Sequence, residues 1–164
     1  MACALLCGCV AHRQGAVETN PAKSGAPPAT PAGTPANPNQ AANDAEVQRI
    51  LGTIAGREKQ PAEQVFQNLQ VAGLKTIPAE RLLRIMNMGY SRALGVACTH
   101  CHVEGDFASD DKRPKRAARD MVALARAVNE QIGQMKYLDP ERTDHVINCG
   151  TCHRGGIDPR AGDR

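Results

Sequence analysis

The stretch "CTHCH" at residues 98–102 places two cysteines three positions apart, with a histidine directly after the second. The same pattern returns as "CGTCH" at residues 149–153. C-x-x-C-H is the attachment signature of c-type haem, and two copies predict two covalently attached haems. In each copy the thiols would bind the haem and the adjacent histidine would bind its iron. The predicted residues are Cys98, Cys101 and His102 for the first haem, and Cys149, Cys152 and His153 for the second.

Paired cysteines also occur in zinc sites and in redox-active dithiols. Two C-x-x-C pairs could form one structural zinc site, but Cys98 and Cys149 stand 51 residues apart, and zinc would leave the histidine after each pair unexplained. A thioredoxin-like site needs one pair next to a βαβ pattern, which this sequence lacks. Covalent haem is therefore the preferred interpretation.

The sequence around the motifs is helical in pattern. Apolar residues recur at helical spacing in segments 45–56, 61–70, 77–95 and 113–133, and no run alternates as a strand would. Asn43 and Asp44 could cap the first helix, and Gly95 is a plausible C-terminal stop for the third. We therefore expect a mainly α fold: a small multihaem c-type cytochrome domain with helices packed around two haems and long loops carrying both CxxCH motifs.

The sixth ligand of the first iron is expected to be a methionine. Met86 and Met88 would lie about 200° apart on an α-helix, so they cannot both face one haem. Met86 shares its face with Leu82 and with Gly89, whose lack of a side chain would let a flat macrocycle lie close. Met86 is therefore preferred, although methionine is more commonly a filler of apolar cores.

For the second iron, Met121 is the corresponding candidate, because it lies on the apolar face of the fourth helix with Leu124, Ala125 and Val128. Met135 and His145 remain alternatives. His145 precedes its own motif by only four residues, so it could more easily reach the other iron.

A run of basic residues surrounds the start of the fourth helix, where the helix dipole disfavours cations. It comprises Lys112, Arg113, Lys115, Arg116 and Arg119. These residues could form a solvated basic face, or they could meet haem propionates or an acidic partner; Arg154 is a further candidate for a propionate.

The N-terminal part of the chain differs in composition from the rest. "LCGC" at residues 6–9 looks like a lipobox, and we interpret residues 1–12 as a clipped lipoprotein-type signal with Cys9 as the lipidated residue. Residues 13–44 contain six prolines and few large apolar residues, which favours a disordered tether. Residues 45–164 would form the dihaem domain. The net charge of +3 does not call for a nucleic-acid partner.

Four stretches give the chain a family resemblance: "LLRIM" (82–86), "LGVACTHCHVEGDFASDDK" (94–112), "RAARDMVALARAVN" (116–129) and "CGTCHRG" (149–155). Together they resemble the cytochrome subunit of photosynthetic reaction centres, over about residues 63–156. The resemblance implies a helical fold in which each haem lies against a helix that offers a methionine, here Met86 and Met121. It also implies a histidine before the second motif that ligates a haem in another half of the subunit, and His145 lies near that place.

The resemblance further implies a lipid-anchored protein on the periplasmic face of the bacterial inner membrane. The well-known subunits carry four haems and this chain carries two motifs, so it looks like a half-length member. We expect an electron carrier that passes single electrons to a membrane complex such as a photosynthetic reaction centre. A respiratory carrier is an alternative. A dihaem peroxidase-like enzyme is another, and it would need an open iron and acid–base groups.

Overall fold

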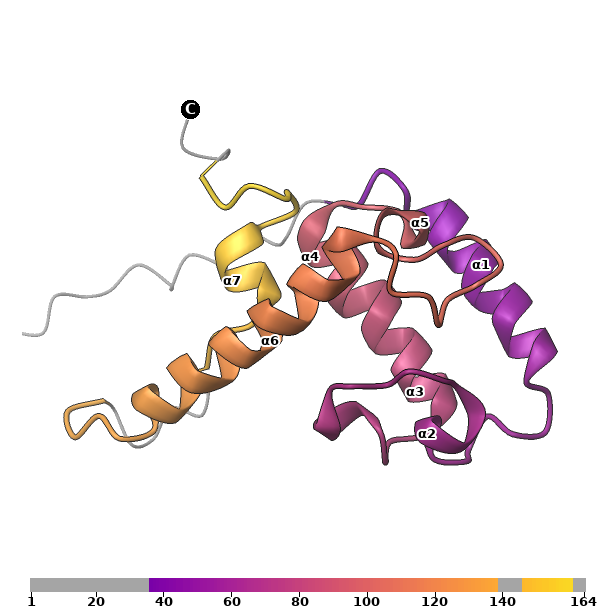
Figure 1. Ribbon diagram of the computed structural model, residues 1–164. Helices are drawn as coiled ribbons and strands as arrows, with labels where there is room; N and C mark the ends of the chain where they lie inside the picture. The colour runs from indigo at the N-terminus through magenta and orange to yellow at the C-terminus, as the bar shows by residue number, and fades with distance from the viewer. Residues whose placement is uncertain (1–35, 139–145, 161–164) are drawn as a thin grey trace, which may run out of the picture. The chain divides into compact units, whose positions relative to one another are not determined.

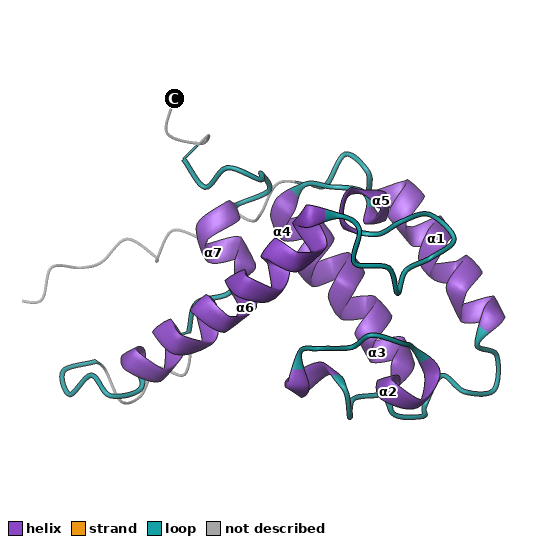
Figure 2. Ribbon diagram, in the orientation of Figure 1, coloured by secondary structure: helices purple, strands orange, loops and turns teal. Residues whose placement is uncertain are grey.

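The computed structural model describes residues 36–138 and 146–160. All regular elements in these residues are helical, and no strand occurs among them (Figure 2). Cys9, most of the expected tether and His145 lie outside the described residues. The elements are α1 Gln40–Thr53, α2 Ala62–Val65, the 3-10 turn η1 Ala72–Leu74, α3 Ala79–Arg84, the π-helix η2 Ile85–Ser91, α4 Arg92–Leu94, α5 Cys98–Cys101, α6 Arg113–Ile132 and α7 Cys149–His153. The mainly α expectation is confirmed.

The first helix begins earlier than the sequence indicated. It starts at Gln40, so Asn43 and Asp44 lie inside it and neither caps it. Asn43 is 1% exposed and bonds to the segment before the first CxxCH motif. The expected tether 13–44 therefore ends too late, because its last residues belong to the packed fold.

The expected helix 61–70 is wrong beyond Val65. Phe66 is extended, and Asn68 has a positive φ of 58°. The side chain of Asn68 donates to the carbonyl oxygen of Ala108 at 2.6 Å and to Asp110 at 2.9 Å. This long-range attachment turns the chain away from a helical course.

The expected helix 77–95 is present as one run through α3, η2 and α4. It ends as predicted at Gly95, whose φ of 68° lies in the left-handed region that glycine adopts readily. Its middle, Ile85–Ser91, is a π-helix. Such a segment holds one more residue per hydrogen-bonded turn than an α-helix and is frequent at functional sites.

The apolar core lies between the N-terminal helices. Ile54, Ala79 and Leu83 are buried, and residues of α1 and α2 with Phe66 pack against them. The other helices carry the motifs: α5 packs against α6, and α7 packs against α4 and η2 (Figure 1). Each CxxCH motif thus sits on a single short helix rather than in a long loop, because its cysteines fall in α5 and α7.

Candidate haem-binding sites

The first motif is held by a buried asparagine of α1. Asn43 donates from Nδ2 to the carbonyl oxygen of Val96 at 3.0 Å, and its Oδ1 accepts from the backbone N–H of Cys98 at 3.0 Å. Asn37 donates to the same Val96 oxygen at 2.9 Å. These bonds fix the turn that leads into α5, so the thiols of Cys98 and Cys101 start from a fixed backbone.

A cavity of about 550 Å³ opens beside this motif, within the range of roughly 300–1,000 Å³ of cofactor pockets. Cys98, Cys101, His102 and Met86 all line it. Most of the remaining wall is apolar and comes from α1, α2, α3 and residues 65–74. Two thiols, an imidazole and a thioether around one apolar space fit the donor set that a c-type haem requires.

Of the two methionines in the π-helix, only Met86 lines this cavity. Met86 is half-buried and lines the cavity. Met88 is 45% exposed, and its sulfur lies 3.7 Å from Nε2 of Gln40. The geometry therefore agrees with the preference for Met86, while its role as an iron ligand stays a prediction.

His102 is oriented by a backbone carbonyl. Its Nδ1 lies 3.0 Å from the carbonyl oxygen of Phe107, and its ring lies 5.1 Å from the Phe107 ring. A carbonyl only accepts, so Nδ1 carries the proton and Nε2 is left as the metal-binding atom. Burial lowers the pKa of His102, which favours the neutral imidazole that binds iron.

The basic run is largely occupied by the loop before α6. Lys115 is buried and donates to three backbone carbonyls of residues 107–109. Arg119 donates two hydrogen bonds to Asp110, at 2.8 and 2.9 Å. These bonds are the main reason that the pKa of Asp110 lies well below its usual range, and the hydrogen bond from Asn68 is the next largest cause. Lys112 donates to the carbonyl of Thr99.

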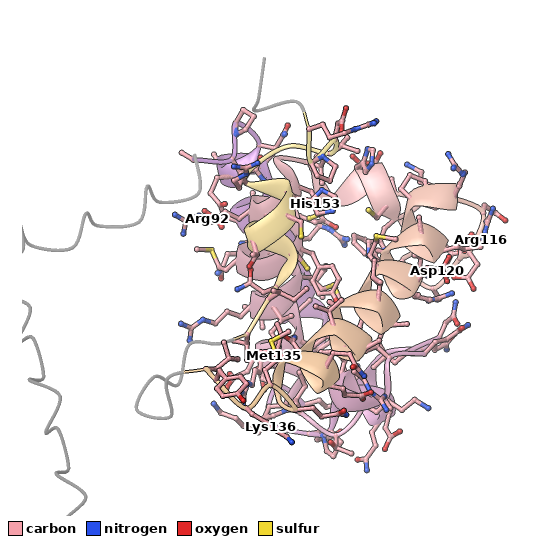
Figure 3. The ribbon with its side chains drawn as sticks, turned by 90° about the vertical axis from the view of Figure 1, so that its left-hand side faces the viewer. Arg92, Arg116, Asp120, Met135, Lys136 and His153 are labelled. Atoms are coloured by element: carbon pink, nitrogen blue, oxygen red, sulfur yellow. The ribbon has the colours of Figure 1, made fainter. Side chains whose placement is uncertain are left out.

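Within this run, Arg113 is exposed, and Arg116 projects from α6 on the side opposite to α7 (Figure 3). The contacts of Lys115 and Arg119 with the loop show that the prediction of a merely solvated basic face is wrong for these two residues. Sequence reasoning missed their role because their partners are backbone carbonyls and one carboxylate that no spacing rule connects to them.

The second motif is positioned by two asparagines. Asn129 of α6 donates to the carbonyl oxygen of Ile147 at 2.9 Å and accepts from its N–H at 2.7 Å. Asn148 forms a capping box with Thr151 at the start of α7. The motif is thereby held beside α6.

A more open hollow of about 540 Å³ lies between α6 and the second motif, lined by residues that include Val122, Ala125, Asn129 and Cys149. His153 repeats the arrangement of the first site, with Nδ1 3.1 Å from the carbonyl oxygen of Gly156. Both motif histidines thus present Nε2 for a metal.

The ligand on the far side of the second haem is less defined. Met121 is 49% exposed and is not among the residues that line the hollow, and Met135 is 57% exposed. The expected apolar face is wrong for Leu124, which is 55% exposed, because α6 turns Val122, Ala125 and Asn129 toward the motif instead. His145 lies outside the described residues.

The two sites are joined through the end of α4. The N–H of Gly155 donates to the carbonyl oxygen of Ala93 at 2.8 Å, and a Cβ on Gly95 would lie 2.2 Å from the Gly155 oxygen. Tyr90 lines the first cavity; burial raises the pKa of its hydroxyl to about 12, and Cys149 adds to this shift.

Comparison with known proteins places this geometry in a family. Residues 24–161 match the family model described as photosynthetic reaction centre cytochrome C subunit. The chain belongs to this family. Its members are electron-carrying cytochromes with covalently bound haem c rather than enzymes, and the resemblance noted in the sequence is confirmed.

Several curated relatives match part of the chain. Cytochrome c-554 of Chloroflexus aurantiacus is 33% identical over 111 residues, which cover 65% of this chain and 26% of the relative. The photosynthetic reaction center cytochrome c subunit of Rubrivivax gelatinosus is 36% identical over 114 residues, which cover 58% of this chain and 31% of the relative. The subunit of the same name from Thermochromatium tepidum is 34% identical over 102 residues, which cover 60% of this chain and 23% of the relative. The chain thus spans about a quarter to a third of the length of these relatives.

None of the four motif cysteines of this reaction centre cytochrome family member is paired in a disulfide with another described cysteine. Among the described residues, no three Cys, His, Asp or Glu side chains are grouped as a metal cluster would need. Burial raises the pKa of Cys98, Cys101 and Cys149. Within residues 36–138 and 146–160, no helix has the length and apolar character that crossing a bilayer requires.

Proposed function

We propose that the chain is a periplasmic dihaem c-type cytochrome that accepts one electron at a time from a donor protein and passes it to a membrane complex. The observation that carries the proposal is the cavity in which Cys98, Cys101, His102 and Met86 meet. Thiols for attachment, an imidazole and a thioether on one apolar space match a closed electron-transfer haem. Each transfer oxidises the donor and reduces the acceptor by one electron.

A bound haem supplies the one-electron couple, and the chain's residues hold it and tune it. Cys98 and Cys101 would attach the first haem, His102 would bind its iron, and Met86 would close the sixth position and raise the potential. Cys149, Cys152 and His153 would hold the second haem, with Met121 as its proposed methionine and His145 as the alternative. The apolar wall of the first cavity would exclude water from the haem edge.

We further propose a photosynthetic reaction centre as the membrane acceptor, and a lipid on Cys9 as the attachment to the periplasmic face of the inner membrane. The names of the relatives support the first part. The lipobox-like "LCGC" supports the second.

The proposal is tested on the exported, haem-matured full chain. Haem content per chain is measured by the pyridine haemochrome assay, and the ferric spectrum is examined for the far-red band of methionine sulfur bound to iron. We expect two covalent haems. Replacement of Met86 by alanine should remove about half of the far-red band if both irons carry methionine, whereas Met88→Ala, on the same helix, should leave the band unchanged.

Two outcomes would contradict this function. A chain without covalent haem would remove its basis. A high-spin ferric signal in the unmodified protein that shifts on addition of cyanide or peroxide would indicate an open iron, and would favour the enzyme alternative.

A further inference from the structure

Lys115 is the most deeply buried cation of the described residues, with a side chain that is 10% exposed. Its ammonium group donates to the carbonyl oxygens of Phe107, Ala108 and Ser109 at 2.9, 2.8 and 2.7 Å. An ammonium has three donors, and three carbonyls satisfy them. A group bound in this way is part of a built site rather than a surface charge.

One of these carbonyls is the partner of the iron-binding histidine. The Phe107 oxygen also accepts from Nδ1 of His102 at 3.0 Å. At the second motif, the corresponding partner of His153 is the carbonyl oxygen of Gly156, and no lysine of the described residues bonds to it. The buried ammonium is therefore a feature of the first site.

The charge around Lys115 is not fully balanced. Its nearest carboxylate is Asp110, at 3.2 Å, and Arg119 binds the same carboxylate at 2.8 Å. Lys115 and Arg119 thus share one carboxylate beside the loop that holds the imidazole.

We propose that Lys115 is a positioning residue for the first haem: it shares the Phe107 carbonyl with His102 and raises the reduction potential of the iron that His102 binds. The inference rests on the proposed function. A carbonyl that accepts from the imidazole N–H makes the other nitrogen a stronger ligand, which stabilises ferric iron. Competition from Lys115 weakens that effect, and its positive charge favours the reduced form, so both effects raise the potential.

The test is a potentiometric titration of the haem-loaded full chain. Lys115→Met keeps the length of the side chain and removes its charge and donors. Loss of a hydrogen-bonding partner behind a metal ligand changes metal affinity or activity by about 10–100-fold. We expect at least a tenfold change in the reduction equilibrium of one haem, which is a fall of 59 mV for a one-electron couple.

Two variants separate this effect from a general loss of charge. Lys115→Arg keeps the cation and should hold the first potential closer to that of the unmodified protein than Lys115→Met does. Arg113→Met removes an exposed cation from the same end of α6 and should shift neither potential. The wave of the first haem is assigned with Met86→His, which should lower that wave because methionine raises the potential relative to histidine.

Haem content is measured in every variant, so the two proposals can fail separately. Absence of covalent haem from the unmodified chain would defeat the proposed function. Two haems with an unchanged first potential in Lys115→Met would overturn the role of Lys115, and so would an equal shift in Arg113→Met. If Lys115→Met does not retain its first haem, Lys115→Gln replaces it, and an unchanged first potential there overturns the proposal in the same way.

Discussion

Replacement of Asn43 by alanine should destabilise the folded protein by about 2–4 kcal/mol. Asn43 is 1% exposed and makes two bonds to backbone groups, one to the oxygen of Val96 and one to the N–H of Cys98. The Val96 oxygen would keep its bond from Asn37, so this loss costs about 1 kcal/mol. The Cys98 N–H would lose its partner, and an unsatisfied buried donor costs about 1–3 kcal/mol. The contact of the Cys98 sulfur with Asn43 adds nothing to this difference, because haem attachment would consume that thiol.

The assay is chemical unfolding of the haem-loaded protein, followed by far-ultraviolet circular dichroism in samples of equal haem content. The matched control is Gln48→Ala, an exposed position on the same helix, which should stay within about 0.5 kcal/mol of the unmodified protein. If Asn43→Ala falls within that same margin, the bonds from α1 do not hold the first motif, and the reasoning is refuted.

Three further predictions concern other parts of the chain. Gly95→Ala should lower the free energy of unfolding by about 2 kcal/mol or more, since φ is positive and the new Cβ would meet the Gly155 oxygen at 2.2 Å. Thermal melting should show this loss. Gly73→Ala, where nothing lies within 4 Å of the new Cβ, should not show it. Asp110→Asn should reduce stability at neutral pH. Because the pKa of Asp110 is lowered in the folded protein, the unmodified protein should have the larger free energy of unfolding above pH 4–5, that is, above the ordinary carboxyl pKa of about 4. This difference should shrink as the pH falls further, which unfolding at a series of pH values would measure. A difference that stays constant with pH would exclude this contact as the cause. Cys9→Ser should move the protein from the membrane fraction to the soluble periplasmic fraction, and unchanged fractionation would remove the lipid proposal.

The parts of the fold that follow from local pattern could be predicted from the sequence. The stop at Gly95 needs only a glycine after an apolar helical run, and α6 was expected within one residue at its C-terminal end. The two motifs are also local, because the attachment signature of a c-type haem is a fixed spacing within five residues. These features depend on neighbours in the chain, which a single sequence displays directly.

Features that depend on distant partners could not be predicted. Asn43 looks like a helix cap because asparagine favours that position, but its partners lie more than fifty residues away. Asn68 ends the expected helix 61–70 through bonds to residues 108 and 110. Lys115 has the sequence context of a surface residue, and only the fold of the 107–109 loop gives it three carbonyls.

Ideal α-helical angles place Met86 and Met88 on different faces, but the helix there is a π-helix. In a π-helix the angle per residue is smaller, yet the two side chains still lie on nearly opposite sides. Met86 therefore lines the cavity as expected. The π-helix itself could not be predicted, because no residue in "IMNMGYS" distinguishes it from an α-helix by pattern alone.

The π-helix also sets how this region can change length in evolution. One residue deleted between Ile85 and Ser91 could be absorbed by a return to regular α-helical bonding, with the helix unbroken at both ends. A π-helix turns by less per residue than an α-helix, so six α-helical residues span nearly the same rotation as the seven of η2. α4 and the first motif would therefore keep nearly their orientation relative to α3. A one-residue gap in this segment of a homologue need not separate the methionine from the haem site.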